Sequence, residues 1–376
     1  MTAEHSQLLD NDASAANAGD IVLSVRDLTV DFPTHDGVVH AVRGVSYELR
    51  KGEVLGIVGE SGSGKSVTSL AVMGLLPPSA LIAGSVQLLG SELLGLNEKG
   101  LAKLRGDEIA MIFQDPMSSL NPVYTVGWQI AEAVTAHRDV SKAAARARAV
   151  ELLSIVGIPH AEERVDSYPH EFSGGMRQRA VIAIGMANDP DVIIADEPTT
   201  ALDVTVQAQV LETLTTAREQ TGAAMVLITH DLGVVAGQAD RVLVMYAGKP
   251  VEIGTVDEIF YTPRMPYTLG LLGSLPRVDA REQDRLTPIV GVPPSLINMP
   301  PGCPFSPRCP MSQDICRTEE PELRPTTSPE HVAACHFSEK LEGLAPADLF
   351  RPTSADDVLP EPGSGLGTES TPGATS

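Results

Sequence analysis

The chain has 376 residues, of which 43% are hydrophobic, and its formal net charge is −22 at pH 7. This length allows a large core and more than one domain. The excess of acidic residues, without a block of Lys and Arg, argues against a nucleic-acid partner, because contacts to phosphates need a basic face.

The N-terminal segment and the apolar runs of the chain bear on its location. No apolar run approaches the roughly 20 residues that cross a bilayer. Residues 1–20 are polar and acidic and carry neither the basic nor the apolar region of a secretion signal, so we expect a disordered leader. These features predict a cytosolic protein that is held at a membrane only by partners.

From residue 21 to 256, short apolar runs alternate with helical stretches, which predicts an α/β fold with a largely parallel sheet. Residues 21–32 and 38–50 alternate apolar and polar side chains and predict an antiparallel edge sheet. The stretch 125–188 is helical in pattern, with Ser141 as a start signal and Gly157 as a stop signal. Near-continuous apolar runs, typical of strands covered on both faces, lie at 54–59, 109–113, 191–196, 223–229 and 241–246.

The stretch "GESGSGKS" at 59–66, called the P-loop below, fits G-x-x-x-x-G-K-[ST] between an apolar strand and a helix. Its glycines let backbone N–H groups surround a β-phosphate at a helix start. Lys65 would reach the β- and γ-phosphates, and the Ser66 hydroxyl would ligate Mg²⁺. The predicted ATP-binding residues of this segment are Gly59, Ser61, Gly62, Ser63, Gly64, Lys65, Ser66 and Val67.

Polar residues end three of the predicted strands. Asp196 and Glu197 follow "VIIA", where Asp196 would hold Mg²⁺ and Glu197 would orient or deprotonate the attacking water. Gln114 follows "MIF", and His230 follows "VLIT". Because the C-terminal ends of parallel strands converge on the ligand crevice, Gln114 would ligate Mg²⁺ and position water, and His230 would hydrogen-bond the γ-phosphate. Taken singly, each of these two residues also reads as an ordinary loop residue.

Residues 172–179 read "FSGGMRQR", a serine and two glycines that lead into a polar helix start. Exposed N–H groups at such a start make a second anion site, here without a lysine. The order of the motifs along the chain resembles that in the ATP-binding subunits of ABC transporters. The motifs are, in order, the P-loop, the Gln after a strand, "SGG", "DE", "ALD" and "TH". The resemblance implies an ATP-binding domain at 21–256. It would contain a P-loop core with a parallel sheet, an antiparallel β-subdomain and a helical signature subdomain at about 115–188.

The same resemblance implies that two subunits pair head to tail. The "SGG" helix start of one subunit would then contact the nucleotide held by Lys65 of the other, which supplies the lysine that the start lacks. Phe32 stands where the family places an aromatic that stacks on adenine, and Met176 replaces a Gln common in the family without changing the backbone cradle. The residues that the resemblance assigns to the ATP of the opposing subunit are Ser173, Gly174, Gly175 and Asp203.

Three further stretches, 112–122, 246–272 and 291–309, resemble the oligopeptide/dipeptide importer branch of this family. The resemblance implies an ATPase that energises import of oligopeptides or dipeptides from the cytoplasmic face of the membrane. Its partners would be two transmembrane permease subunits and a paralogous ATP-binding subunit, in a heterodimer rather than a homodimer. An extracytoplasmic substrate-binding protein would be an indirect partner. Nickel, glutathione or oligosaccharide import is the alternative within the branch, and a soluble non-transport ABC ATPase is the alternative class.

Residues 257–340 are rich in proline and hold the four cysteines of the chain, which predicts a small loop-rich domain. Four thiols in such a segment of a cytosolic protein indicate a metal staple rather than disulfides, although no C-x2-4-C pair typical of zinc is present. The importer branch implies a [4Fe–4S] cluster, with Zn²⁺ or unligated thiols as alternatives. Residues 341–376 are acidic and predict a disordered tail. The candidate cluster ligands are Cys303, Cys309, Cys316 and Cys335.

Overall fold

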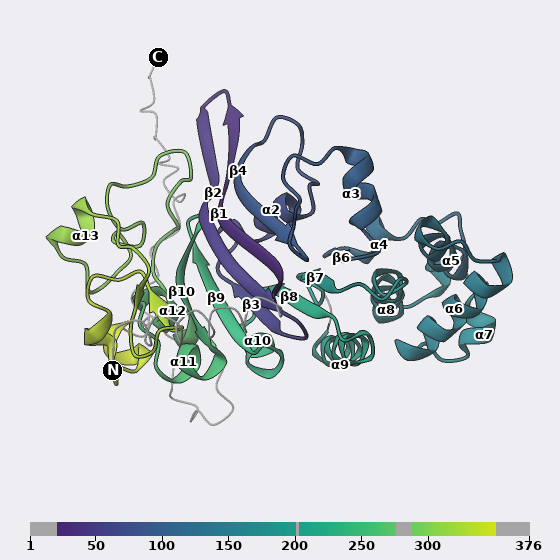
Figure 1. Ribbon diagram of the computed structural model, residues 1–376. Coiled ribbons are helices and arrows are strands. Elements are labelled where there is room, and N and C mark those ends of the chain that lie inside the picture. The colour runs from purple at the N-terminus through teal and green to yellow at the C-terminus, as the bar shows by residue number, and fades with distance from the viewer. Residues whose placement is uncertain (1–20, 201–202, 276–287, 351–376) are drawn as a thin grey trace, which may run out of the picture.

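The computed structural model describes residues 21–200, 203–275 and 288–350. The predicted leader, 1–20, and residues 351–376 of the predicted tail lie outside the described residues. Figure 1 shows the arrangement: the helices α5, α6 and α7 lie at one end of the molecule, and the C-terminal segments lie at the opposite end.

The predicted antiparallel sheet near the N-terminus is confirmed. Four strands pair in the order β2-β1-β4-β5, and β1 and β2 stay paired antiparallel from the Ile21–Arg50 pair to the Thr34–Gly37 pair. In β2 the alternating pattern places every second side chain inward, as at Val45, Tyr47 and Leu49, which are buried. The strands are β1 (Ile21–Thr34), β2 (Gly37–Arg50), β4 (Leu81–Leu88) and β5 (Ser91–Glu92).

The central sheet has eight strands in the order β11-β12-β10-β9-β3-β8-β7-β6. The five strands from β9 to β6 are parallel, and they are the five apolar runs that the sequence predicts as strands. The other three are antiparallel, so the sheet is mixed rather than wholly parallel. Its strands are β3 (Val54–Val58), β6 (Ile109–Ile112), β7 (Val192–Asp196), β8 (Ala224–Thr229), β9 (Arg241–Tyr246), β10 (Lys249–Thr255), β11 (Arg324–Pro325) and β12 (Val332–Ala333).

Each face of the parallel strands packs against a different layer. In β7, Ile193 and Ala195 face a core shared with the long helices, while Val192 and Ile194 face a core shared with the antiparallel sheet and α2. Burial on both faces explains why these strands read as continuous apolar runs. The helices of these two layers include α2 (Lys65–Val72), α5 (Val126–His137), α6 (Lys142–Ile155), α8 (Gly174–Gly185) and α9 (Val204–Thr221).

The predicted start and stop signals of α6 agree with the structure. The Ser141 side chain accepts a hydrogen bond from Ala144 N, and Gly157 after the helix has φ +70°. The remaining helical segments are α3 (Glu98–Leu104), α4 (Pro116–Ser119), α7 (Ala161–Arg164), η1 (Pro169–Glu171), α10 (Leu232–Gln238), α11 (Val256–Tyr261), α12 (Pro266–Gly273), α13 (Asp314–Thr318), η2 (Ser338–Leu341) and α14 (Pro346–Leu349).

The C-terminal region shares its core with the nucleotide-binding part of the chain. Tyr267, Phe305 and Phe350 are buried against side chains of β9 such as Val244 and Tyr246. This packing corrects the predicted start of the disordered tail, because residues 341–350 form part of η2 and all of α14, and Phe350 is only 5% exposed. The apolar side chains Leu341, Leu349 and Phe350 hold this segment against the rest of the protein.

Candidate nucleotide-binding site

The P-loop joins β3 to α2, and its glycines have backbone conformations that other residues rarely adopt. Gly59, Gly62 and Gly64 have φ of +153°, +79° and +100°. A Cβ atom on Gly59 would lie 2.3 Å from Met245 O, and one on Gly64 would lie 2.5 Å from Ala41 O. The chain therefore needs glycine at both places for the loop to fit against β9 and β2.

Lys65 and Ser66 open α2 and point to different partners. The buried Lys65 Nζ donates to the carbonyl oxygens of Gly59, at 2.7 Å, and of Glu60, at 3.0 Å. Burial lowers the pKa of Lys65, and the carboxylates of Glu197, Asp196 and Glu60 oppose that shift. Two backbone oxygens thus hold the ammonium group that the motif predicts for nucleotide phosphates.

Asp196 ends β7 and accepts a hydrogen bond from Ser66 Oγ at 3.0 Å. Burial raises the pKa of Asp196, while the Ser66 hydrogen bond and the Lys65 charge lower it. A partly buried hydroxyl–carboxylate pair at the helix start provides two of the oxygen ligands that Mg²⁺ prefers, so these residues suit the predicted metal.

Glu197 lies where three strand ends meet. Its Oε2 accepts hydrogen bonds from Gln114 Nε2 at 3.1 Å and from Thr200 Oγ1 at 2.8 Å, and it lies 3.5 Å from His230 Nδ1. Gln114, Glu197 and His230 follow β6, β7 and β8, which are neighbours in the sheet. The structure therefore brings these three predicted residues together, with a carboxylate at the centre.

Thr200 is a contact of Glu197 that the sequence reasoning missed. Glu197 has φ +48°, a left-handed conformation that is uncommon outside glycine, and its backbone N–H donates to Ile228 O at 2.9 Å. This turn folds the chain back so that Thr200, three residues later, reaches the carboxylate. A hydroxyl in "DEPTT" was the available signal, but the sequence does not show which threonine faces inward.

The predicted second anion site forms the start of α8. Ser173 is the N-cap, and its side chain accepts from Met176 N at 3.3 Å. Ser173 and Gly174 are exposed, and a Cβ on Gly174 would meet no atom within 4 Å. Gly175 is buried, and a Cβ there would lie 2.5 Å from Val206 Cγ1 of α9.

Asp203 caps the neighbouring helix. Its side chain accepts from Val206 N at 3.0 Å at the start of α9. Because Val206 also contacts Gly175, the two helix starts are packed together. The structure therefore places the four residues predicted for the opposing nucleotide on adjoining helix ends.

Four further predicted residues have less defined surroundings. Phe32 lies in β1 opposite Val39, is partly buried and packs against the core of the antiparallel sheet, so its adenine contact stays a prediction. Ser61 is exposed in the P-loop, and Val67 packs against the same core as Phe32. The Ser63 hydroxyl is buried and has no hydrogen-bond partner among the described residues.

The four cysteines line one small pocket of about 20 Å³ and form no disulfide. Cys303 N donates to Cys316 O at 2.8 Å, which joins two of the segments. Burial raises the pKa of Cys309 to about 11 and that of Cys335 to about 12. Within the described residues, no group of three or more His, Cys, Asp or Glu side chains has an arrangement that could hold a metal ion. The structure thus gathers the predicted ligands without arranging them as a metal site.

Comparison with known families agrees with this geometry. A family model described as "ABC transporter" matches residues 42–200, and one described as "Oligopeptide/dipeptide transporter, C-terminal region" matches residues 251–316. Among solved structures, a dimeric ATP-binding cassette in a post-hydrolysis state with ADP and Pi has a TM-score of 0.56 and 27% identity. The match covers 62% of this chain and 98% of that one.

Curated relatives extend the match along most of the chain. The oligopeptide transport ATP-binding protein OppD of Mycobacterium tuberculosis is 57% identical over 88% of this chain, which spans 54%, about half, of that relative's length. The dipeptide transport ATP-binding protein DppD of Bacillus subtilis is 54% identical over 85% of this chain and 95% of its own length. OppD of Escherichia coli is 51% identical over 85% of this chain and 94% of its own length.

The P-loop, the strand-end carboxylates and the mixed sheet define an ABC-type ATP-binding protein. Within that class, the chain belongs to the family of oligopeptide and dipeptide transporter ATP-binding subunits. In the part of the chain that the structure describes, no helix combines the length and apolar character that a membrane span requires.

Proposed function

We propose that this chain binds and hydrolyses ATP to energise import of oligopeptides or dipeptides through an ABC transporter. The observation that carries the proposal is the grouping of Gln114, Glu197 and His230 at one sheet edge, beside the Ser66–Asp196 pair. The names of the relatives, which are oligopeptide and dipeptide transport proteins, support the substrate class. Nickel, glutathione or an oligosaccharide remains the alternative cargo.

The geometry suggests how the chain's residues would act on nucleotide. Lys65 would exchange its two carbonyl partners for the β- and γ-phosphates, since phosphate oxygens are the stronger acceptors for an ammonium group. Ser66, Asp196 and Gln114 would hold Mg²⁺, which neutralises charge on the phosphates. Glu197 would orient or deprotonate the attacking water, with Gln114 and Thr200 fixing its carboxylate and His230 facing the γ-phosphate.

The second half of the site would come from another subunit. Ser173 and Gly174 are exposed at the start of α8, and the solved cassette with ADP and Pi is a dimer, which supports a head-to-tail pair. Each γ-phosphate would contact both subunits only when the dimer is closed, so ATP binding would close the dimer. Loss of the phosphate would remove these contacts and open it. We favour a paralogous ATP-binding subunit over a second copy as the partner.

The surface between the sheet edge and the helical subdomain suits the permease subunits. A groove of about 700 Å³ runs there, and its apolar lining includes Phe113, Val181 and Ile184. Met117 of α4, Tyr124 and Trp128 are exposed close by in sequence. Such an apolar groove is typical of a protein interface, so we place the chain at the cytoplasmic face of the membrane through two permeases. Co-purification with ribosomes or DNA instead would favour a soluble ABC ATPase.

We also propose a [4Fe–4S] cluster at the four-cysteine pocket, with Zn²⁺ as the alternative. The support is that all four cysteines of the chain, which fall within residues 303–335, line one cavity. Cys303, Cys309, Cys316 and Cys335 would supply one thiolate to each iron. Purified anaerobically, the protein should contain about four iron atoms per chain and absorb visible light, and Cys303→Ser should lose both. Colourless protein with one zinc per chain would contradict the cluster.

The experiment that tests the proposed function uses Glu197→Gln in the assembled transporter. The amide keeps the shape of the carboxylate but cannot accept the proton of water, so hydrolysis should fall by about 10²-fold or more while ATP binding persists. Lys65→Ala is the matched control, because it should lose binding as well. Hydrolysis by Glu197→Gln at the wild-type rate would remove Glu197 from the catalytic role.

A further inference from the structure

The C-terminal region contacts the P-loop at Glu60, the residue directly after Gly59. The Arg308 guanidinium donates to both carboxylate oxygens of Glu60, at 2.6 Å and 2.9 Å. The Arg308 side chain is only 5% exposed and that of Glu60 is 28% exposed, so the guanidinium end of this bidentate pair is shielded from water. The two residues are 248 positions apart in sequence.

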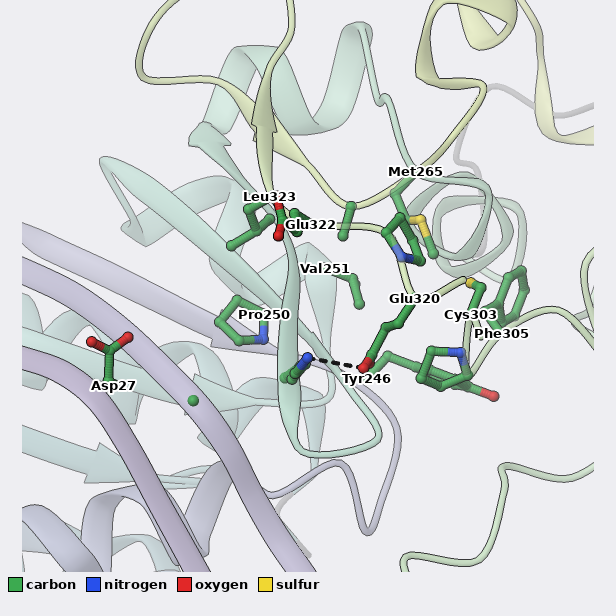
Figure 2. A pocket seen from close by; sticks show the side chains of 15 residues that line it. Asp27, Tyr246, Pro250, Val251, Met265, Cys303, Phe305, Glu320, Glu322 and Leu323 are labelled. Carbon is green, nitrogen blue, oxygen red and sulfur yellow. Dashed lines mark ion pairs between the residues drawn. The ribbon is translucent and has the colours of Figure 1, made fainter. Parts of the chain in front are cut away.

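Aromatic residues fix the other side of this contact. The backbone N–H of Glu60 donates to the hydroxyl of Tyr267 in α12 at 2.8 Å, and Tyr267 is fully buried. The rings of Tyr246, Tyr267 and Phe305 pack together, with centroids 4.6 to 5.5 Å apart. The Arg308 guanidinium lies about 6 Å from two of these rings. Figure 2 shows Tyr246 and Phe305 close together beside Cys303, at the border of a pocket of about 470 Å³.

The backbone of Glu60 in turn holds the phosphate-binding residues. Its carbonyl oxygen accepts from Lys65 Nζ at 3.0 Å and from Ser63 N at 3.2 Å. Glu60 is therefore fixed at its amide by Tyr267 and at its carboxylate by Arg308, while its carbonyl holds Lys65 in the absence of nucleotide. A P-loop that already has its phosphate-binding conformation before ATP arrives loses less conformational entropy on binding.

Charge gives Arg308 a second effect. Glu60 puts a carboxylate into a loop that binds an anion, and an unpaired carboxylate there would repel the phosphates. The Arg308 cation cancels that charge within hydrogen-bond distance. We propose that Arg308, together with Tyr267, is a positioning residue for ATP: it neutralises Glu60 and fixes the P-loop in its phosphate-binding shape. The inference rests on the proposed ATP-binding function and adds the C-terminal region to the nucleotide site.

The test compares full-length variants in the assembled transporter by titration with a fluorescent ATP analogue. Arg308→Met keeps an apolar stem over the rings but leaves Glu60 unpaired, so the dissociation constant should rise about tenfold, with kcat at saturating ATP nearly unchanged. The loss should shrink at high salt, because screening weakens the repulsion. Adding Glu60→Gln to Arg308→Met should restore affinity to within about threefold of the wild type.

Two controls separate positioning from simple support of the fold. Arg43→Met breaks another ion pair, in which Arg43 Nη2 donates to both carboxylate oxygens of Glu320, at 3.1 Å and 3.0 Å. This pair also joins the C-terminal region to the rest of the chain but does not touch Glu60. It should leave the dissociation constant within about twofold of the wild type. Arg308→Lys keeps the cation without the bidentate geometry, and it should weaken binding by about threefold even if Arg308→Met fails to fold.

The outcomes distinguish this inference from the function on which it rests. Wild-type affinity in both Arg308 variants, or no recovery on adding Glu60→Gln, would overturn the role of Arg308 while ATP binding by the wild type stands. An equal loss in Arg43→Met would also overturn it, since any ion pair to the C-terminal region would then have the same effect. A wild-type transporter that binds no analogue would instead overturn the proposed function.

Discussion

The negative charge of Asp196 that would bind Mg²⁺ lowers the stability of the folded protein. The carboxyl is buried, and its pKa is raised chiefly by that burial, which means that the folded protein disfavours the ionised form. A carboxyl whose pKa is higher in the folded than in the unfolded state adds stability below its unfolded pKa and loses it as pH rises through the folded value. At neutral pH the charge therefore costs stability, and Mg²⁺ would offset that cost only when nucleotide is bound.

This balance predicts the behaviour of Asp196→Asn. The amide can still accept the Ser66 hydrogen bond but carries no charge, so the nucleotide-free variant should unfold about 2–4 °C above the wild type near neutral pH. The advantage should shrink as the pH is lowered and Asp196 takes up its proton. Differential scanning calorimetry over a pH series checks both points. A variant that melts below the wild type near neutral pH would show that the buried charge is not a cost.

The sequence predicts some residues of the site and not others for a physical reason. Asp196, Glu197, Gln114 and His230 follow apolar strands directly, and parallel strands bring such positions together whatever the loops do. Thr200 reaches Glu197 only through a left-handed turn, which no spacing reveals. The Arg308–Glu60 contact joins residues 248 positions apart, so only the folded chain shows it.

At the scale of elements, the α8 start shows two neighbouring glycines with different constraints. Gly175 faces Val206 of α9, whereas Gly174 faces open space in this subunit. Val206 is β-branched and stiff within a helix, so it cannot move aside easily for an added methyl group. Packing within the subunit therefore explains Gly175, but it leaves Gly174 unexplained unless another molecule approaches.

The two glycines thus predict opposite results for two alanine substitutions. Gly175→Ala should lower the free energy of unfolding by about 1–3 kcal/mol, because α8 and α9 must separate. Gly174→Ala should leave it unchanged but reduce ATP hydrolysis in the assembled transporter, since the methyl group would face the opposing nucleotide. Thermal unfolding and an ATPase assay give the two readouts. Full activity in Gly174→Ala would argue against the close approach of a second subunit.

Sequence patterns located most elements but not the antiparallel edge of the central sheet. The five parallel strands and the Ser141 cap follow from local apolar runs and capping chemistry. Strands β11 and β12 are two residues long each; β12 pairs with β10 across more than seventy residues of chain, and β11 pairs with β12. Such short strands carry no alternation of their own, and their pairing is set by tertiary packing.

At the scale of the whole molecule, the C-terminal region is tied to the nucleotide-binding part rather than attached as a separate unit. Composition marks this region as loop-rich, because it is rich in proline and holds the four cysteines, but composition does not show what its aromatic residues pack against. Beyond Tyr267 and Phe305, a fully buried His331–Glu252 pair at 2.8 Å links β10 to the segment before β12. Changes in the C-terminal region that reach Glu60 through Arg308 or Tyr267 should therefore alter nucleotide binding.

The central claim is that ATP lies between two polypeptides. One supplies Lys65 and the Mg²⁺ ligands, and the other supplies Ser173 and the backbone N–H groups at the start of α8. A structure of the Glu197→Gln transporter with ATP bound tests it most directly. The account predicts Ser173 Oγ and Gly175 N within hydrogen-bond distance of a γ-phosphate held by the P-loop of the opposing subunit. Ser173 turned to solvent, or bound to the nucleotide of its own chain, would contradict it.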